Sequence, residues 1–122
     1  MYSVVLYTCG VVNALFTAFH LFLGAAIARL PSLAPSYRAL MQALNVSGFL
    51  LIAFLAVAFL ACQADLRSRL GRATILLGAL LYLTRALGEI VIFPAVNPVI
   101  VTLCVVAGAL HLAALRAPRA SV

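Results

Sequence analysis

Long apolar runs alternate with short polar segments along this chain. Four runs have the length of a membrane span, over residues 2–28, 37–63, 74–93 and 99–115. A transmembrane helix needs about 20 consecutive, mostly apolar residues, and the connections between these runs are short. Short connections favour antiparallel neighbours. The pattern therefore predicts an all-α integral membrane protein, a four-helix up-down-up-down bundle that forms a single domain over residues 1–122.

Turn and capping residues predict where the spans begin and end. Pro31 and Pro35 interrupt the chain after the first run, and Ser36 is a candidate N-cap for the second. Pro94 is expected to end the third run. Asn97-Pro98 is a typical helix start, with asparagine as the cap and proline in the first turn. The segment Ala64 to Ala73 holds one acidic and three arginine side chains, which places it outside the hydrocarbon.

Composition supports lipid as the solvent. Hydrophobic residues make up 67% of the chain and charged residues only 8%, whereas a soluble domain carries about 25% charged residues. The net charge is +6. The arginines flank the apolar runs and form no dense patch, which argues against a nucleic-acid partner and for the lipid bilayer.

The distribution of arginine predicts the orientation. Three arginines lie between the second and third runs, and Arg116 and Arg119 follow the fourth. The opposite side receives only Arg29 and Arg38. Because basic residues favour the cytoplasmic side, we expect a multi-pass protein of a bacterial inner membrane with both termini in the cytoplasm.

Polar and small residues recur every three or four positions inside the runs, so that each predicted helix has one marked face. These stripes are Gly10, Asn13, Thr17, His20 and Gly24; Arg38, Gln42 and Asn45; Thr74, Gly78, Tyr82, Arg85 and Glu89; and Asn97, Cys104, Gly108 and His111. Such stripes are typical of helix–helix packing in membranes.

Counting depth along each helix predicts which polar residues share a level. At about 1.5 Å per residue, His20, Asn45 and Glu89 lie roughly 7–8 Å outward of the midplane, and Arg85 lies near it. We therefore expect these four to form one intramembrane polar cluster, the candidate site. His111 lies in the inner half, nearest to Asn13, and this second pair is a secondary candidate.

Two interpretations of the cluster stay open. Arg85 and Glu89 are spaced i, i+4, so their charges can meet on one helical face and neutralise each other as a structural ion pair. Charged residues near the midplane also mark substrate, ion or proton sites. His20 suits a hydrogen-bonded packing role, a proton carrier or a ligand.

Cofactor chemistry has little support in the sequence. His20 and His111 lie roughly 13–14 Å apart in depth, too far to ligate one haem iron. Cys9, Cys62 and Cys104 fall on separate runs at different depths, as expected of small packing residues. No cofactor and no metal site are predicted.

No catalytic motif is present, and the only acids, Asp65 and Glu89, lie at opposite levels. We therefore expect no enzyme but an accessory membrane protein that binds other membrane proteins or a second copy of itself. The alternative is a small oligomeric transporter or channel that uses the polar cluster. Small multidrug exporters are similar in size and span number, but their membrane glutamate lies in the first span and Glu89 lies in the third.

Overall fold

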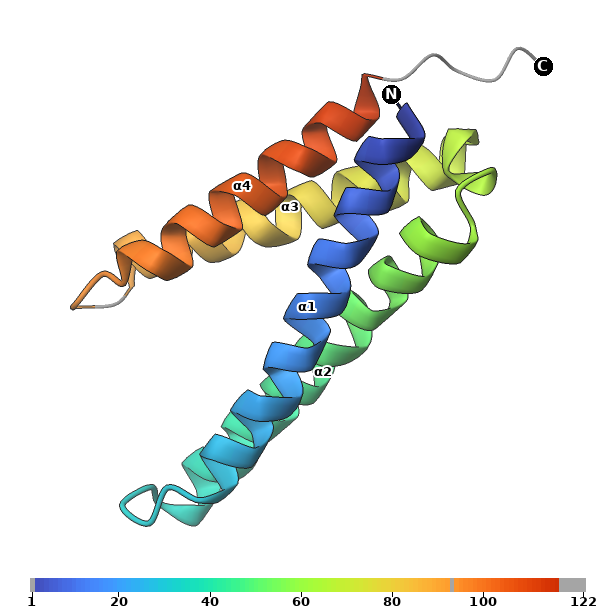
Figure 1. Ribbon diagram of the computed structural model, residues 1–122. Coiled ribbons are helices and arrows are strands. Elements are labelled where there is room, and N and C mark those ends of the chain that lie inside the picture. The colour runs from blue at the N-terminus through green and yellow to red at the C-terminus, as the bar shows by residue number, and fades with distance from the viewer. Residues whose placement is uncertain (1, 93, 117–122) are drawn as a thin grey trace.

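The computed structural model describes residues 2–92 and 94–116 and contains four long helices (Figure 1). They are α1 (Tyr2–Ala28), α2 (Pro35–Ala61), α3 (Arg69–Val91) and α4 (Pro98–Leu115), with a short 3₁₀ turn, η1 (Asp65–Arg67), between α2 and α3. All four helices are long and apolar enough to cross a membrane. The predicted all-α class and the four apolar spans are confirmed.

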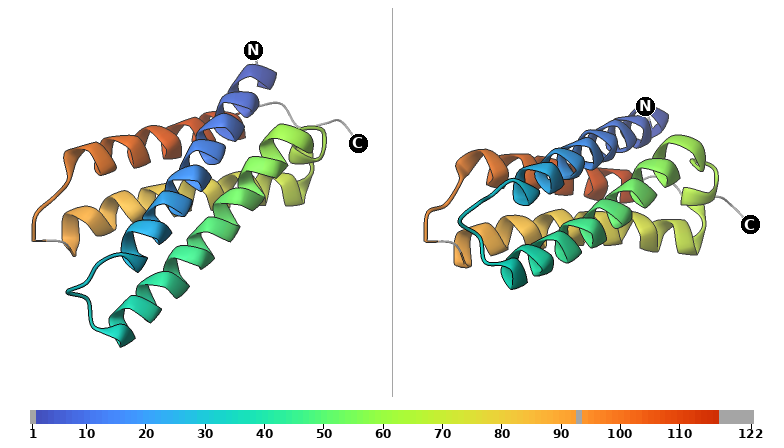
Figure 2. Two further views of the ribbon diagram at one scale, coloured as in Figure 1. Left: turned by 60° about the horizontal axis from the view of Figure 1, so that its bottom comes forward. Right: turned by 90° about the horizontal axis from the view of Figure 1, so that it is seen from below.

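The helices pair in sequence order as two antiparallel hairpins, α1 with α2 and α3 with α4. The hairpins cross, so that the four helices do not run side by side along their whole length (Figures 1 and 2). They meet where α1 begins, α4 ends and η1 connects α2 to α3, and they diverge toward the α1–α2 and α3–α4 loops. The four helices keep the expected up-down order, and the two hairpins diverge into an open V.

Two of the predicted helix starts need correction. The helix α2 begins at Pro35 with Ala34 as the N-cap, and no side chain caps it, so Ser36 is not the cap. The helix α3 begins at Arg69, five residues before the predicted start, because Ser68 Oγ accepts a hydrogen bond from Gly71 N (3.0 Å). The first turn of α3 can be polar because the helix is expected to begin outside the hydrocarbon layer of the membrane.

The start of α4 agrees with the predicted asparagine cap. Asn97 Oδ1 accepts hydrogen bonds from the backbone of Val99 (3.1 Å) and Ile100 (3.4 Å), with Pro98 in the first turn. The predicted last residue of the third span, Phe93, and the tail residue Arg119 lie outside the described residues.

The buried core lies where the hairpins converge. Leu6 and Cys9 of α1, Phe59 of α2 and Ile75 of α3 belong to one buried cluster, which Leu66 of η1 joins. A second cluster lies further toward the open end and holds Tyr82, Ala86, Cys104 and Ala107, against which Val12 and Phe16 of α1 pack. The hairpins are therefore joined at one end by apolar packing.

The small residues of the stripes lie where helices approach closely. A Cβ added at Gly24 comes within 3.0 Å of the Asn45 amide across the α1–α2 seam. One added at Gly78 meets the His111 ring across the α3–α4 seam. Small side chains allow such close approach between helices, so Gly24 and Gly78 lie in the seams within the two hairpins.

Candidate functional site

His20 and Asn45 form a reciprocal pair within the first hairpin. Asn45 Oδ1 lies 2.9 Å from His20 Nδ1, and Asn45 Nδ2 donates to the His20 carbonyl oxygen at 3.0 Å. An amide oxygen only accepts, so the His20 proton lies on Nδ1. Next to them, Gln42 Nε2 donates to the Gly24 carbonyl at 2.7 Å. These bonds hold α1 against α2 near the α1–α2 loop.

Arg85 and Glu89 form an ion pair on α3. Arg85 Nη1 lies 2.7 Å from Glu89 Oε2, which confirms that the i, i+4 spacing brings the charges together. Glu89 Oε1 also accepts a hydrogen bond from the Asn97 backbone at 3.2 Å. The Glu89 side chain is buried, whereas that of Arg85 is 44% exposed. The Glu89 carboxylate thus ties α3 to the start of α4, and the Arg85 guanidinium stays partly exposed.

The four residues therefore come together as two pairs, not as the single bonded cluster predicted. His20 and Asn45 belong to one hairpin, and Arg85 and Glu89 belong to the other. Counting the rise along each helix had predicted that these residues lie at a similar depth in the membrane. The crossing of the hairpins assigns the pairs to separate arms of the V (Figure 1).

A third polar group, which is fully buried, joins the two hairpins through Asn13, Tyr82 and His111. Asn13 of α1 lies 3.2 Å from His111 Nε2 of α4, as the depth count predicted, and Tyr82 of α3 donates its hydroxyl proton to Asn13 Oδ1 at 2.8 Å. His111 Nδ1 lies 2.8 Å from the Ala107 carbonyl. A carbonyl only accepts, so the proton lies on Nδ1 and Nε2 accepts from the Asn13 amide.

This trio, Asn13, Tyr82 and His111, is satisfied without any external ligand. The second proton of Asn13 Nδ2 goes to the Cys9 carbonyl at 2.8 Å. The rings of Phe59 and Tyr82 pack against the imidazole, with centroid distances of 4.9 and 5.4 Å. Tyr82 was recognised from the sequence only as a stripe residue, because the period of α3 shows its face but not its partner on α1.

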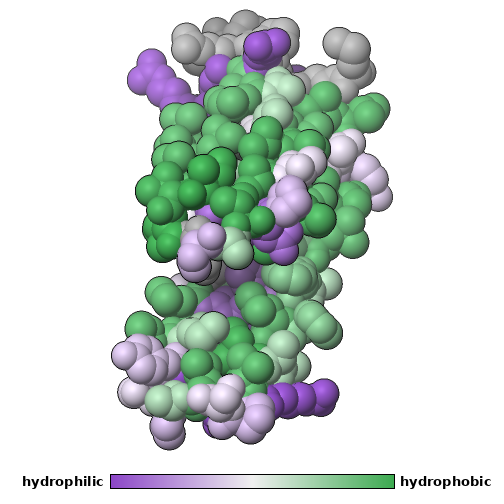
Figure 3. Space-filling view, turned by 90° about the vertical axis from the view of Figure 1, so that its left-hand side faces the viewer, coloured by the Kyte–Doolittle hydropathy of each residue, from purple (hydrophilic) through white to green (hydrophobic). Residues whose placement is uncertain are grey.

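Between the arms lies a hollow, which we call the inter-hairpin cleft. At its apex, Phe16 of α1 contacts Tyr82 of α3, with ring centroids 5.0 Å apart. One turn further out, Phe19 and His20 continue the face of α1 that carries Val12 and Phe16, and Arg85 and Glu89 continue the face of α3 that carries Tyr82. Figure 3 looks into the open side, where hydrophilic colour shows at the floor between two hydrophobic lobes.

On the face of α1 beside the cleft, one aromatic side chain and one imidazole are partly exposed. Phe19 is 48% exposed, and His20 is partly buried. Within the described part of the chain, no hydrogen bond engages His20 Nε2. The cleft thus lies between the face of α1 that carries His20 and the face of α3 that carries Arg85. The Glu89 side chain is buried, and Asn45 holds His20 against α2.

The described ranges contain no group of three or more His, Cys, Asp or Glu residues able to hold a metal ion. His20 bonds to α2 and His111 bonds to α1, so the two imidazoles belong to different sites. Cys9 and Cys104 are buried and Cys62 is exposed, all three as free thiols.

Comparison with known proteins returns no relative: no protein-family model, no curated protein and no solved structure matches this chain.

Proposed function

We propose that this chain is a non-enzymatic accessory protein of the bacterial inner membrane, with both termini cytoplasmic, whose inter-hairpin cleft receives a transmembrane helix of another membrane protein. The observation that supports the proposal is that Arg85, although paired with Glu89, keeps 44% of its side chain exposed on α3. A charged side chain near the bilayer centre costs about 2.5–3.5 kcal/mol against lipid. A neighbouring helix with polar side chains removes that cost.

Charge complementarity favours a different protein over a second copy. The whole chain has only two acids. Glu89 is bonded to Arg85 and to the Asn97 backbone, and Asp65 belongs to η1 at the opposite end of α3. A second copy therefore brings no further carboxylate to the cleft. The expected occupant is a helix that carries an acidic or amide side chain at the level of Arg85.

Site-specific photo-crosslinking in native membranes tests the proposal. Phe19→p-benzoylphenylalanine places the probe beside the cleft, and Leu21→p-benzoylphenylalanine, whose parent side chain is 63% exposed, places it on the opposite face of α1. We expect the Phe19 probe, and not the Leu21 probe, to give an adduct that peptide mass spectrometry maps to a transmembrane segment of another membrane protein.

A second set of variants ties that adduct to the ion pair. Substituting Arg85→Ala together with Glu89→Ala should abolish it, because the polar contact is lost. Thr84→Val should preserve it, because the exposed Thr84 hydroxyl bonds only to the Leu80 carbonyl of its own helix. Adducts exclusively to lipid, or to a second copy of the chain, contradict the proposal.

One observation favours a second candidate, a small proton-coupled transporter. His20 carries an imidazole nitrogen without a hydrogen bond to the described residues, and the chain places a carboxylate, Glu89, on the other hairpin. Intramembrane His and Glu side chains are typical of proton relays.

For this candidate, purified protein in liposomes with an imposed potential should carry protons, and Glu89→Gln should lower the flux by about tenfold or more, as expected for loss of an essential proton carrier. Asp65→Asn is the matched control, since Asp65 is the other acid and lies in η1. Flux equal to that of empty liposomes, or equal in both variants, rejects the candidate.

A further inference from the structure

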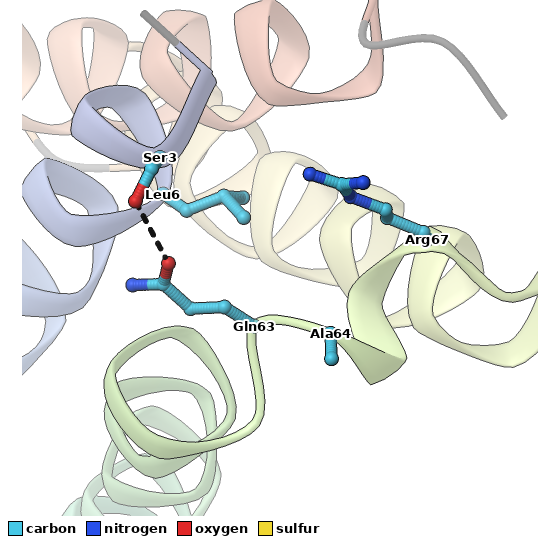
Figure 4. A pocket seen from close by; sticks show the side chains of 5 residues that line it. All are labelled: Ser3, Leu6, Gln63, Ala64 and Arg67. Carbon is cyan, nitrogen blue, oxygen red and sulfur yellow. Dashed lines mark hydrogen bonds between the residues drawn. The ribbon is translucent and has the colours of Figure 1, made fainter. Parts of the chain in front are cut away.

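A pocket of about 450 Å³ lies at the convergent end of the molecule, separate from the inter-hairpin cleft. Its lining residues are Ser3, Leu6, Gln63, Ala64 and Arg67 (Figure 4). Sites for small ligands commonly measure about 300–1,000 Å³. The volume therefore suits a polar head group with part of its attached chain.

The pocket has a polar rim and an apolar floor. Ser3 Oγ donates to Gln63 Oε1 at 3.2 Å, which joins the start of α1 to the α2–α3 connection on one side. Figure 4 shows Arg67 on the other side, with Leu6 between them. Leu6 is buried and belongs to the core cluster. This combination matches an amphiphile whose anionic end lies at the rim.

Local sequence explains why Arg67 occupies the rim. Leu66, in the middle of η1, is buried in the core cluster, so its neighbours Asp65 and Arg67 are held at the surface. Among the described residues that line the pocket, Arg67 is the only charged one. The lining therefore favours an anion over a cation or a zwitterion.

The depth of the pocket relative to the apolar helices favours a phospholipid as the molecule that carries the anion. Ser3 lies in the first turn of α1, and Arg67 precedes the first residue of α3, so both mark the ends of apolar spans. Phospholipid phosphate groups occupy this level, and basic pockets between transmembrane helices bind anionic head groups. Exposed Val4 and Tyr7 on α1 offer apolar surface beside the pocket for an acyl chain.

We propose that the pocket bounded by Ser3, Leu6, Gln63 and Arg67 binds the phosphate group of an anionic phospholipid. The site is independent of the partner-binding proposed for the cleft, because it lies at the other end of the helices. Its ligand is a phosphodiester held by the Arg67 guanidinium, with the Gln63 amide at the rim and the glycerol end against Leu6.

Native mass spectrometry of the detergent-purified protein, titrated with phosphatidylglycerol or phosphatidylcholine, tests the site. We expect wild type to retain phosphatidylglycerol preferentially, and Arg67→Gln to weaken that binding by about fivefold, the contribution typical of one basic residue near the membrane surface. Arg67→Lys, which keeps the charge, should retain the preference.

The matched control is Arg69→Gln. It removes the same charge two residues away, from a side chain that does not line the pocket, and should change the affinity by less than about twofold. Equal losses in Arg67→Gln and Arg69→Gln overturn the proposal, because they indicate a general surface potential. Displacement of the lipid by an equal concentration of glycerol phosphate overturns the lipid as the source of the phosphate.

Discussion

Replacing Gly71 with alanine is expected to destabilise the protein by about 3 kcal/mol, the upper part of the range for overpacking a core. A Cβ at this position overlaps the backbone of Asp65 and Leu66 in η1. Because the opposing atoms are backbone, no change of rotamer relieves the overlap. The connection must move away from α3, which withdraws Leu66 from the core. Unfolding in mixed detergent micelles measures the loss.

Gly88 provides the control within the same helix. An alanine Cβ there has only Ile92 Cδ1 within reach, at an ordinary 3.8 Å. Replacing glycine by alanine in a helix gains about 1 kcal/mol in propensity, so Gly88→Ala should leave stability unchanged or raise it. A Gly71→Ala protein as stable as Gly88→Ala would show that η1 does not pack against α3 as described.

Replacing Asn13 with leucine is expected to cost about 2 kcal/mol and to loosen the contact between the hairpins. The change leaves the Tyr82 hydroxyl and His111 Nε2 without their partner in a fully buried site. Each interhelical hydrogen bond in a membrane contributes about 0.6 kcal/mol, up to about 1.7, and a buried polar group left unpaired costs about 1–3 kcal/mol.

Thr17→Val is the matched control for Asn13→Leu. The Thr17 hydroxyl lies on the same face of α1, but it bonds only to the Asn13 carbonyl of its own helix at 2.8 Å. A double-mutant cycle between Asn13→Leu and His111→Phe isolates the bond between the hairpins. A coupling free energy near zero, or equal losses for Thr17→Val and Asn13→Leu, contradicts a role for the trio in holding the hairpins together.

The trio also matters for the cleft. It shares Tyr82 with the Phe16–Tyr82 contact at the apex, and it joins α1 to both helices of the second hairpin. The polar bonds nearer the open end, such as His20–Asn45 and Glu89–Asn97, stay within one hairpin. In the described part of the chain, each arm is thus braced internally, and the hydrogen bonds between the hairpins lie near the convergent end.

Much of the local structure is predictable from the residue pattern, because its causes are local. Hydropathy and length identify the four helices. Asn97-Pro98 marks the start of α4 because the backbone N–H groups that donate to the Asn97 cap lie only two and three residues away. The Arg85–Glu89 pair follows from one turn of helix. Two helix starts were predicted wrongly because they depend on their neighbours. Ser36 does not cap α2, because the preceding Pro35 already starts that helix. The arginines in the first turn of α3 made this turn look like part of the polar loop.

The sequence by itself indicated that the helices are apolar enough for lipid, where they lie, and which face of each is polar. Hydrophobicity and a 3.6-residue period act within one segment, so they can be read locally. It also indicated that Asn13 and His111 share a level. The tertiary structure decided which faces meet. Only the crossing of the two hairpins separates His20 and Asn45 from Arg85 and Glu89, joins Tyr82 to Asn13, and opens the cleft, because the angle between helices depends on side-chain packing at residues far apart in the chain.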